Sequence, residues 1–89
     1  MKILYTKKFN KDIDQITHDK KRKKNLLELI TKIKQADALT DLESVRKIQG
    51  YDKYFRIRVD DFRLGIKITN NGIEMLRFLH RKEIYRRFP

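Results

Sequence analysis

Apolar residues recur at helical spacing in the first part of the chain. Residues 2–5 predict a short strand, and Thr6 is a residue type that often caps the start of a helix. The helix predicted to follow spans about residues 7–17, because its apolar positions recur with a period of about 3.6 residues. These positions are Phe9, Ile13 and Ile16.

A second helix is predicted after a charged turn over residues 18–24. Its apolar stripe has the same period and consists of Leu26, Leu27, Ile30 and Ile33. Two amphipathic helices joined by a short polar link favour an antiparallel helical hairpin. Residues 35–45 are less regular and predict a connector before a turn at Gly50. The apolar anchors of this connector are Leu39, Leu42 and Val45.

Alternation of apolar and polar residues replaces the helical period in the second half of the chain. Residues 54–59 and 62–69 alternate, so each predicts a strand with one apolar and one polar face. Residues 72–80 are apolar on both faces for most of their length, which predicts an interior strand. Asp and Asn-Gly residues at 60–61 and 70–72 supply tight turns, so the three strands are predicted to form an antiparallel meander.

The order of these elements predicts a single α+β domain over residues 1–89. We expect a small antiparallel sheet made of the N-terminal strand and the C-terminal three-strand meander. The two-helix hairpin is expected to pack on this sheet, because each amphipathic element must bury its apolar face against another.

Charge is the dominant feature of the composition. The chain has 23 Lys and Arg against 12 Asp and Glu, a net charge of +11 at pH 7. Such a field attracts polyanions, so nucleic acid is the first expected partner, with an anionic membrane surface or an acidic protein as alternatives. The charge could also serve solubility alone. Global disorder is excluded, because the apolar residues are periodic and abundant.

The sequence also limits the cellular setting. It has no Cys, so disulfides and thiolate metal sites are excluded. The short apolar stretch at the N-terminus is broken by lysines, unlike a secretory signal, and no apolar run reaches the length of a membrane span. We therefore expect a cytoplasmic protein.

Arginines are concentrated on the predicted strands. Before residue 45 there is a single Arg, whereas the strand alternation places Arg56, Arg58, Arg63 and Lys67 on one side of the meander, opposite its apolar face. Like charges on neighbouring strands repel, so this grouping favours an anionic ligand. Arg suits phosphate because its planar, permanently charged group donates parallel hydrogen bonds. The alternative is a solvated face whose arginine stems cover apolar surface.

The end of the last predicted strand carries three further candidates, His80, Arg81 and Tyr85. His titrates near neutral pH and can transfer a proton, and Tyr can stack on a base. Each also has a structural alternative, which is a hydrogen bond at the strand end for His80 and packing of the C-terminus for Tyr85.

Other kinds of catalytic site are not indicated. The sequence has no Ser/His/Asp set, no Gly-rich phosphate loop and no carboxylate pair with convincing spacing. His18 and His80 are far apart and lack companion ligands, so neither a metal site nor a cofactor is expected. A nuclease of this composition would be metal-free and would need RNA, whose 2′-hydroxyl is an internal nucleophile.

Four short motifs lie within residues 45–86: Lys47-Ile48-Gln49-Gly50, Phe55-Arg56-Ile57-Arg58-Val59, Asp61-Phe62-Arg63, and His80-Arg81 followed by Tyr85. Together they resemble the RelE/ParE superfamily of bacterial type II toxins. The resemblance implies a small sheet with a helical hairpin packed on one side. In the RelE branch it implies cleavage of mRNA in the ribosomal A site, where a 2′-hydroxyl attacks the adjacent phosphate.

By position, the resemblance also implies roles for individual residues. Arg56 and Arg58 match the basic residues of the family's central strand, and Arg63 matches the Arg that grips phosphate. Arg81 matches the basic residue after the last strand, and Tyr85 matches the Tyr that aligns or stacks on the substrate.

One departure from the family concerns the general base. The best-understood members have Lys where Arg58 stands, and Arg cannot easily accept a proton. Either Arg58 only stabilises charge while His80 or Lys47 moves the proton, or the protein is a slower nuclease or none. Lys47 and Lys67 are expected to contact the substrate.

The leading hypothesis is a toxin that cleaves mRNA on the ribosome. Its expected partners are the ribosome with its mRNA, and a cognate antitoxin that is acidic or amphipathic and covers the arginine face. The alternatives are a ParE-like inhibitor of DNA gyrase and an RNA-binding module without activity.

Overall fold

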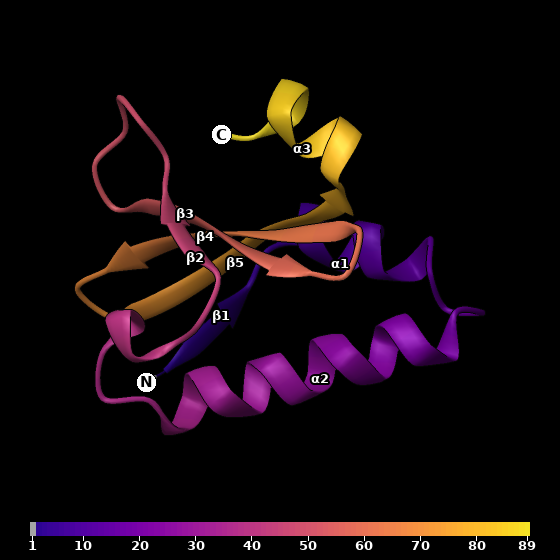
Figure 1. Ribbon diagram of the computed structural model, residues 1–89, viewed down its shortest axis with the longest axis horizontal. Coiled ribbons are helices and arrows are strands. Elements are labelled where there is room, and N and C mark those ends of the chain that lie inside the picture. Colours follow the sequence, from indigo (N-terminus) through magenta and orange to yellow (C-terminus); the bar gives the residue numbers. More distant parts are fainter. Residues whose placement is uncertain (1) are drawn as a thin grey trace.

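Nine short elements make up the fold, which the computed structural model describes for residues 2–89 (Figure 1). The α+β class predicted from the sequence is confirmed. In chain order the elements are β1 (Ile3–Tyr5), α1 (Lys7–Asp14), α2 (Lys20–Gln35), the 3-10 turn η1 (Leu39–Asp41), β2 (Val45–Lys47), β3 (Tyr54–Val59), β4 (Phe62–Thr69), β5 (Gly72–His80) and α3 (Arg81–Arg87).

One five-stranded sheet has the order β1-β5-β4-β3-β2. β3, β4 and β5 pair as the predicted antiparallel meander. The prediction that the N-terminal strand is also antiparallel is wrong, because β1 runs parallel to β5. The chain reaches β5 only after the two helices and the other strands, and a long connection of this kind permits a parallel pair.

The fifth strand, β2, lies at the end of the segment predicted as a connector. It pairs antiparallel with β3, placing Val45 opposite Ile57 and Arg46 opposite Arg56. A strand of three residues is too short for alternation to be recognised in the sequence. The predicted apolar anchors of the connector are confirmed, since all three pack in or against the core.

The two helices of the hairpin differ in length from the prediction. α1 ends at Asp14, before the predicted residue 17. α2 begins within the predicted turn 18–24, because the side chain of Asp19 accepts a hydrogen bond from the backbone N–H of Arg22 and caps the helix. Leu27 is 56% exposed and does not belong to the buried stripe. Within residues 2–89, no helix combines the length and hydropathy needed to span a bilayer.

The main core lies between the helix pair and one face of the sheet, with α2 running beneath the strands in Figure 1. Its buried residues from β3 and β4 belong to the face that the alternation predicts to be apolar, so this prediction is confirmed. The buried members are Phe9, Ile16, Leu26, Ile30, Ile33, Leu39, Ile57, Val59, Leu64, Ile66, Ile73, Met75 and Phe78.

The opposite face of the sheet is partly covered by α3, which is longer than the single turn predicted. A second apolar cluster of Leu79, Ile84 and Phe88 attaches α3 to the strands. The ring of Phe88 lies directly on Gly65, where an added Cβ would come within 2.8 Å of the ring. The glycine therefore permits the close approach that anchors the C-terminal segment over β4.

A buried ion pair joins α1 to the edge of β5. The carboxylate of Asp12 accepts hydrogen bonds from Arg77 Nε at 2.8 Å, from Arg77 Nη2 at 3.0 Å and from the backbone N–H of Phe78 at 2.9 Å. β1 ends at Tyr5, opposite Met75, so Asp12 supplies an acceptor where β5 continues without its strand partner.

The hydrogen bond to Asp12 raises the pKa of Arg77 above its ordinary value. A cation whose pKa is raised in the folded state contributes its full stabilisation below the pKa of the unfolded state and loses it as the pH rises through the folded value. For Arg77 that loss lies in strongly alkaline solution, so the contribution is complete at neutral pH.

Replacing Asp12 should lower the stability of the protein more than replacing an exposed acidic residue of the same helix. We expect Asp12→Ala to lower the free energy of unfolding by about 3–5 kcal/mol, because it leaves the Arg77 cation buried without its counter-ion. The matched control is Asp14→Ala on the exposed part of α1, which should change stability by less than about 0.5 kcal/mol. Urea denaturation monitored by circular dichroism measures both, and equal effects would contradict this role.

Candidate functional site

The face of the sheet that carries α3 also carries the predicted arginines. Arg58 and Arg63 are directly opposite each other across β3 and β4. Arg46 of β2 is directly opposite Arg56 of β3. Like charges at directly facing positions of a sheet destabilise it by roughly 0.2–1 kcal/mol per pair. Two such pairs on one face indicate a site for an anion.

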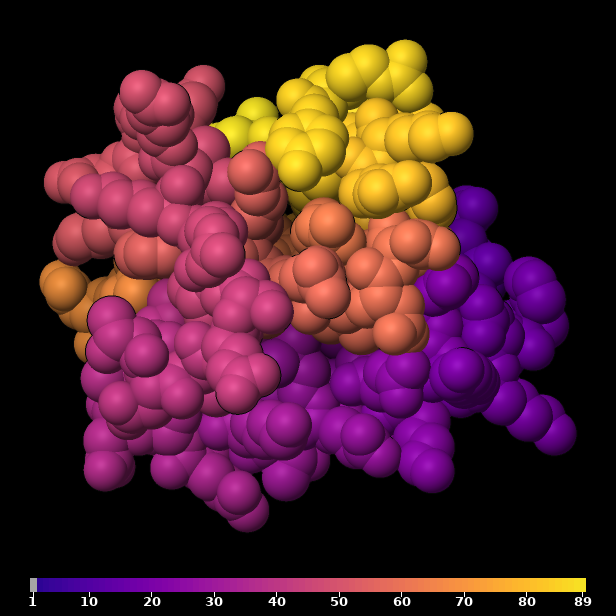
Figure 2. Space-filling model, in the orientation of Figure 1, coloured from indigo at the N-terminus to yellow at the C-terminus, as the bar shows by residue number. Residues whose placement is uncertain are grey.

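These four arginines line one hollow of about 220 Å³. Its lining residues are Ser44, Arg46, Arg56, Arg58, Arg63 and Tyr85. Figure 2 views the sheet from its β2 edge, with α3 in yellow above the pink surface of β2 and β3 and the salmon surface of β4. The predicted grouping of Arg56, Arg58 and Arg63 is confirmed.

Arg46 and Ser44 are lining residues that sequence reasoning missed. The only signal for them was the motif Val-Arg-Lys at 45–47, in which Val45 is the inward residue and Arg46 the outward one. Once β2 is recognised as a strand, alternation places Arg46 on the same face as Arg56. Ser44 precedes the strand in a positive-φ conformation, and no sequence pattern marks it.

Backbone carbonyls hold two of the guanidinium groups. Arg63 Nη1 donates to the carbonyl oxygens of Asp60 and Phe62, both at 2.9 Å, and Arg46 Nη1 donates to that of Val45 at 3.0 Å. A guanidinium group has five N–H donors, so each of these arginines has further donors for a ligand. The carbonyl contacts limit the conformational freedom that ligand binding would otherwise remove.

Tyr85 closes one side of the hollow. It lies on α3, is 60% exposed, and its ring faces the Arg56 guanidinium, with Cζ 4.6 Å from the ring centroid. This cation–π contact places the ring beside the arginines. The second apolar cluster sets this position, because Ile84 and Phe88 on either side of Tyr85 are buried.

Arg81 and His80 do not line the hollow. Arg81 is exposed in the first turn of α3, and its backbone N–H donates to the carbonyl of Asp61 at 2.8 Å. His80 caps α3, with its Nδ1 accepting from the backbone N–H of Lys82 at 3.1 Å. Its ring lies against Phe62, which packs on the core residue Phe78 and is covered by Arg22 of α2, so His80 is on the helix side of the sheet, away from the hollow. The position of His80 therefore fits the structural alternative, which is a hydrogen bond at the end of the strand.

The two predicted substrate-binding lysines also lie outside the hollow. Lys67 is opposite Tyr54 and its Nζ lies 5.3 Å from that ring centroid. It is separated from the arginines by Gly65 and the Phe88 ring that covers it. Lys47 is exposed, and its Nζ lies 3.5 Å from Asp52 Oδ1. It lines a neighbouring hollow that Arg56 and Tyr85 also line.

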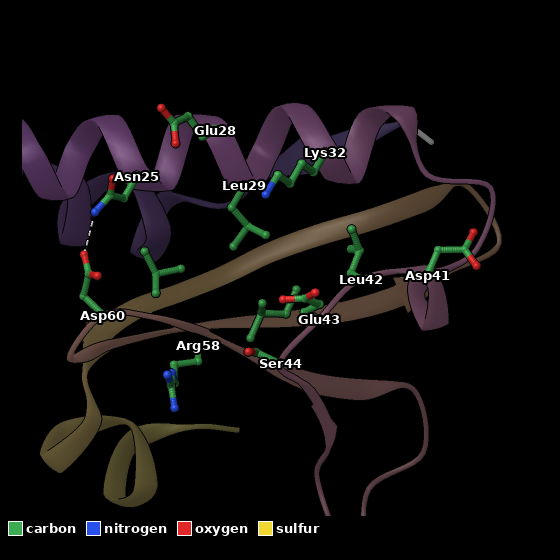
Figure 3. Close-up of a pocket in the computed structure, with 12 residues that line it drawn as sticks. Asn25, Glu28, Leu29, Lys32, Asp41, Leu42, Glu43, Ser44, Arg58 and Asp60 are labelled. Carbon is green, nitrogen blue, oxygen red and sulfur yellow. Dashed lines mark hydrogen bonds between the residues drawn. The ribbon is translucent and has the colours of Figure 1, made fainter.

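A larger cleft of about 480 Å³ borders the arginine hollow on the side of α2 (Figure 3). It shares Ser44 and Arg58 with that hollow, and the figure shows the Arg58 side chain pointing away from α2. The remaining charged groups of the cleft include four carboxylates, on Glu28, Asp41, Glu43 and Asp60. Asp60 accepts a hydrogen bond from Asn25 at 2.7 Å. These carboxylates would repel a polyanion, so the cleft limits the anion-binding face on this side.

The arginine hollow can bind a phosphate and stabilise negative charge. Its lining residues within the described part of the chain include neither a carboxylate nor an imidazole, so they offer no evident proton acceptor. No group of three or more His, Asp or Glu side chains able to hold a metal ion occurs in residues 2–89. The lining residues are suited to act on a ligand through charge and position.

This fold and this hollow define a small α+β protein with an arginine-lined hollow on one face of its sheet. The family described as "ParE toxin of type II toxin-antitoxin system, parDE" matches residues 3–85. The chain is also 41% identical, over the full length of both proteins, to "Toxin RelE3" of Methanocaldococcus jannaschii. The chain therefore belongs to the RelE/ParE superfamily of type II toxins.

Solved structures agree with this assignment. The chain resembles a chain of the RelB-RelE antitoxin-toxin complex from Methanococcus jannaschii, with a TM-score of 0.76, 36% identity and coverage of 97% of this chain and 99% of that one. It has the same fold as a chain of the E. coli DinJ-YafQ toxin-antitoxin complex, with a TM-score of 0.77, 22% identity and coverage of 94% and 96%.

The facing arginines lead to opposite predictions for stability and binding. Arg58→Thr should raise the free energy of unfolding by a few tenths to about 1 kcal/mol, because it removes one like-charged pair from an exposed strand position. The same variant should bind single-stranded RNA about tenfold more weakly, because a hydrogen bond to a charged group contributes about 1.5–3 kcal/mol. Urea denaturation and fluorescence anisotropy measure the two effects.

The control for this pair of effects is Lys24→Ala, which removes the same charge from an exposed position of α2. It should leave RNA affinity within about twofold and should not change the slope of log affinity against log salt. Arg58→Thr should reduce that slope by about 0.7 for each phosphate that the variant no longer neutralises. Equally weakened affinity in the two variants would show that only net charge matters.

Proposed function

We propose that this toxin is a ribosome-dependent endoribonuclease that cleaves mRNA and inhibits translation. The observation that carries the proposal is the hollow in which Arg46, Arg56, Arg58 and Arg63 converge beside Tyr85. The relatives named RelE, to which the chain is similar over nearly its whole length, give independent support. Its site of action is the cytoplasm, where ribosomes and mRNA are found.

The proposed reaction uses the RNA as its own nucleophile. The 2′-oxygen of one nucleotide forms a bond to the adjacent phosphorus, and the bond from phosphorus to the 5′-oxygen of the next nucleotide breaks. The 2′-hydroxyl loses a proton and the departing 5′-oxygen gains one, which leaves a 2′,3′-cyclic phosphate and a 5′-hydroxyl. Neither a metal nor a cofactor is needed, because the nucleophile is held next to its target.

The arginines act on the charge that develops at phosphorus. Arg63 and Arg46, held by backbone carbonyls, and Arg58, which is opposite Arg63, would donate to the non-bridging oxygens. Preorganised donors of this kind contribute about 10²–10³-fold in rate each. Tyr85, fixed against Arg56, would orient the neighbouring nucleotide. Arg81 would contact the backbone of the RNA from the start of α3.

The absence of a base among the described residues that line the hollow supports dependence on the ribosome. Arg remains protonated at neutral pH, and His80 lies on the other side of the sheet. A bound RNA must therefore be held for in-line attack while its proton passes to water, to Lys47 of the neighbouring hollow, or to a group of the ribosome. The ribosome can supply this by ordering the mRNA in the A site, and free RNA should react far more slowly.

We also propose a cognate antitoxin. The structural relatives named RelE and YafQ are described in complexes with the antitoxins RelB and DinJ. For this chain, whose net charge is +11, an acidic or amphipathic partner that covers the arginine face would block RNA and neutralise the facing cations.

The second candidate function is inhibition of DNA gyrase. It is favoured by one observation, which is that the matching family is described as ParE toxin. In this case the same arginines would bind a protein or DNA surface without any reaction. The two candidates share the fold, so only an assay can separate them.

The cleavage hypothesis is tested with purified ribosomes that carry a defined mRNA codon in the A site. The wild-type protein should cut the mRNA at that codon and leave a 2′,3′-cyclic phosphate. Arg63→Ala should lower the rate by about 10²-fold or more, because it removes a preorganised donor to the phosphate. Primer extension locates the cut, and Lys24→Ala is again the charge control.

The decisive comparison adds a DNA gyrase supercoiling assay with the same preparations. If folded wild-type protein leaves the mRNA intact, the nuclease proposal is overturned. Inhibition of supercoiling by the same protein would then support the alternative. If Arg63→Ala keeps whichever activity the wild-type protein has, mRNA cleavage or gyrase inhibition, the arginine hollow is not the functional site.

A further inference from the structure

A second hollow lies next to the arginine hollow and shares its dividing wall. It measures about 600 Å³, within the range of about 300–1,000 Å³ typical of small-molecule sites. Arg56 and Tyr85 line both hollows, so their cation–π contact forms the wall between them. The far side of the second hollow is the loop that joins β2 to β3.

We propose that this second hollow is a nucleobase subsite, in which Tyr51 stacks on a base and Gln49 contacts its edge. The inference rests on the proposed function, because it assigns the base of a nucleotide whose phosphate occupies the arginine hollow. It adds a specificity element, the loop over residues 48–53, to which the sequence motifs assign no role.

The first argument is the position of exposed aromatic rings. Tyr51 is 50% exposed and Tyr85 is 60% exposed, and both line this hollow. Large apolar side chains gathered at the surface often mark a binding site, and an aromatic ring is the surface on which any base can stack. The half-buried Ile48 and the buried Phe88 add an apolar floor from the second cluster.

The second argument is that the loop has a fixed shape. The backbone N–H of Ile48 donates to the carbonyl of Tyr54 at 2.9 Å, and that of Tyr51 donates to the carbonyl of Ile48 at 3.2 Å. Gly50 has a φ of +85°, a conformation that glycine adopts without strain. The loop is therefore closed at its base and presents Tyr51 in one position.

The third argument is the support of the Tyr51 ring itself. It makes an edge-to-face contact with Tyr54 at 5.8 Å between centroids, and Tyr54 in turn contacts Phe88 at 6.0 Å. Phe88 lies on Gly65 of the sheet, so the chain of rings runs from the loop to the rigid part of the fold. Rings fixed in this way lose little conformational entropy when a base stacks on them.

The fourth argument is the distribution of polar groups around the hollow. Gln49 is exposed in its wall and carries both a donor and an acceptor, as reading the edge of a base requires. Lys47 and Arg86 stand at the rim, with side chains 60% and 71% exposed, in exposed ion pairs with Asp52 and Glu83 that contribute little and that a phosphate can replace. Their charge suits the phosphate that flanks the bound nucleotide, whereas the interior suits its uncharged base.

The test measures binding of a short 2′-O-methyl RNA, which the toxin cannot cleave, by fluorescence anisotropy. An abasic residue is placed at each position in turn. One abasic position should weaken binding to the wild-type protein about tenfold, since stacking of one base contributes on the order of that factor. Tyr51→Ala should weaken binding to the intact RNA by a similar factor and should bind the abasic RNA as well as the wild type does.

Three controls make this test specific. Tyr51→Phe keeps the ring and should restore affinity, and Tyr5→Ala removes an equally exposed ring from β1 and should have no effect on it. Gln49→Ala should change the preference among the four bases at the abasic-sensitive position without changing affinity for the abasic RNA. A shift in preference is a result that general loss of stability cannot produce.

The outcomes separate this inference from the function on which it rests. If Arg58→Thr loses affinity but no abasic position or Tyr51 substitution matters, the base subsite is overturned and the phosphate site stands. If RNA binding does not depend on Arg58, the proposed function fails and the subsite fails with it. The proposal is supported if one abasic position weakens RNA binding about tenfold in the wild-type protein and has no effect in Tyr51→Ala.

Discussion

The buried carboxylate of Asp12 is the interaction on which the arrangement of this small protein depends. It joins α1 to the edge of β5 at the point where β1 ends, and it satisfies both the Arg77 side chain and a strand amide. The apolar residues of α1 and α2 share the main core on one face of the sheet. The other face carries α3 and the arginines.

Repulsion is the second constraint. Arg46 faces Arg56 and Arg58 faces Arg63, although a sheet is more stable without directly opposed like charges. The apolar residues buried on the opposite face of the same strands, such as Ile57 and Leu64, stabilise the fold against this repulsion. An anion that binds between the arginines would remove this repulsion, so the proposed affinity of the hollow for phosphate and the repulsion in the free protein would have the same origin. Most other positive charge is lysine on the exposed surface of the helices, which adds to the long-range field.

The chemistry of the hollow follows from what arginine can do. It holds phosphate and stabilises developing charge, but it does not accept a proton. Both functions proposed above, cleavage of RNA with the help of the ribosome and inhibition by binding alone, use these properties of arginine.

The sequence by itself determined the α+β class, the meander, and the convergence of Arg56, Arg58 and Arg63, because helical and strand periodicity are local properties that fix which face each side chain takes. It could not determine contacts that depend on distant segments. Asp12 and Arg77 are 65 residues apart, and nothing local shows that they pair. The three-residue strand β2, and with it Arg46, becomes recognisable only when it pairs with β3. The tertiary structure also decided that Tyr85 reaches the arginines while His80, five residues before it, faces the helices, because the chain turns from β5 into α3 between them.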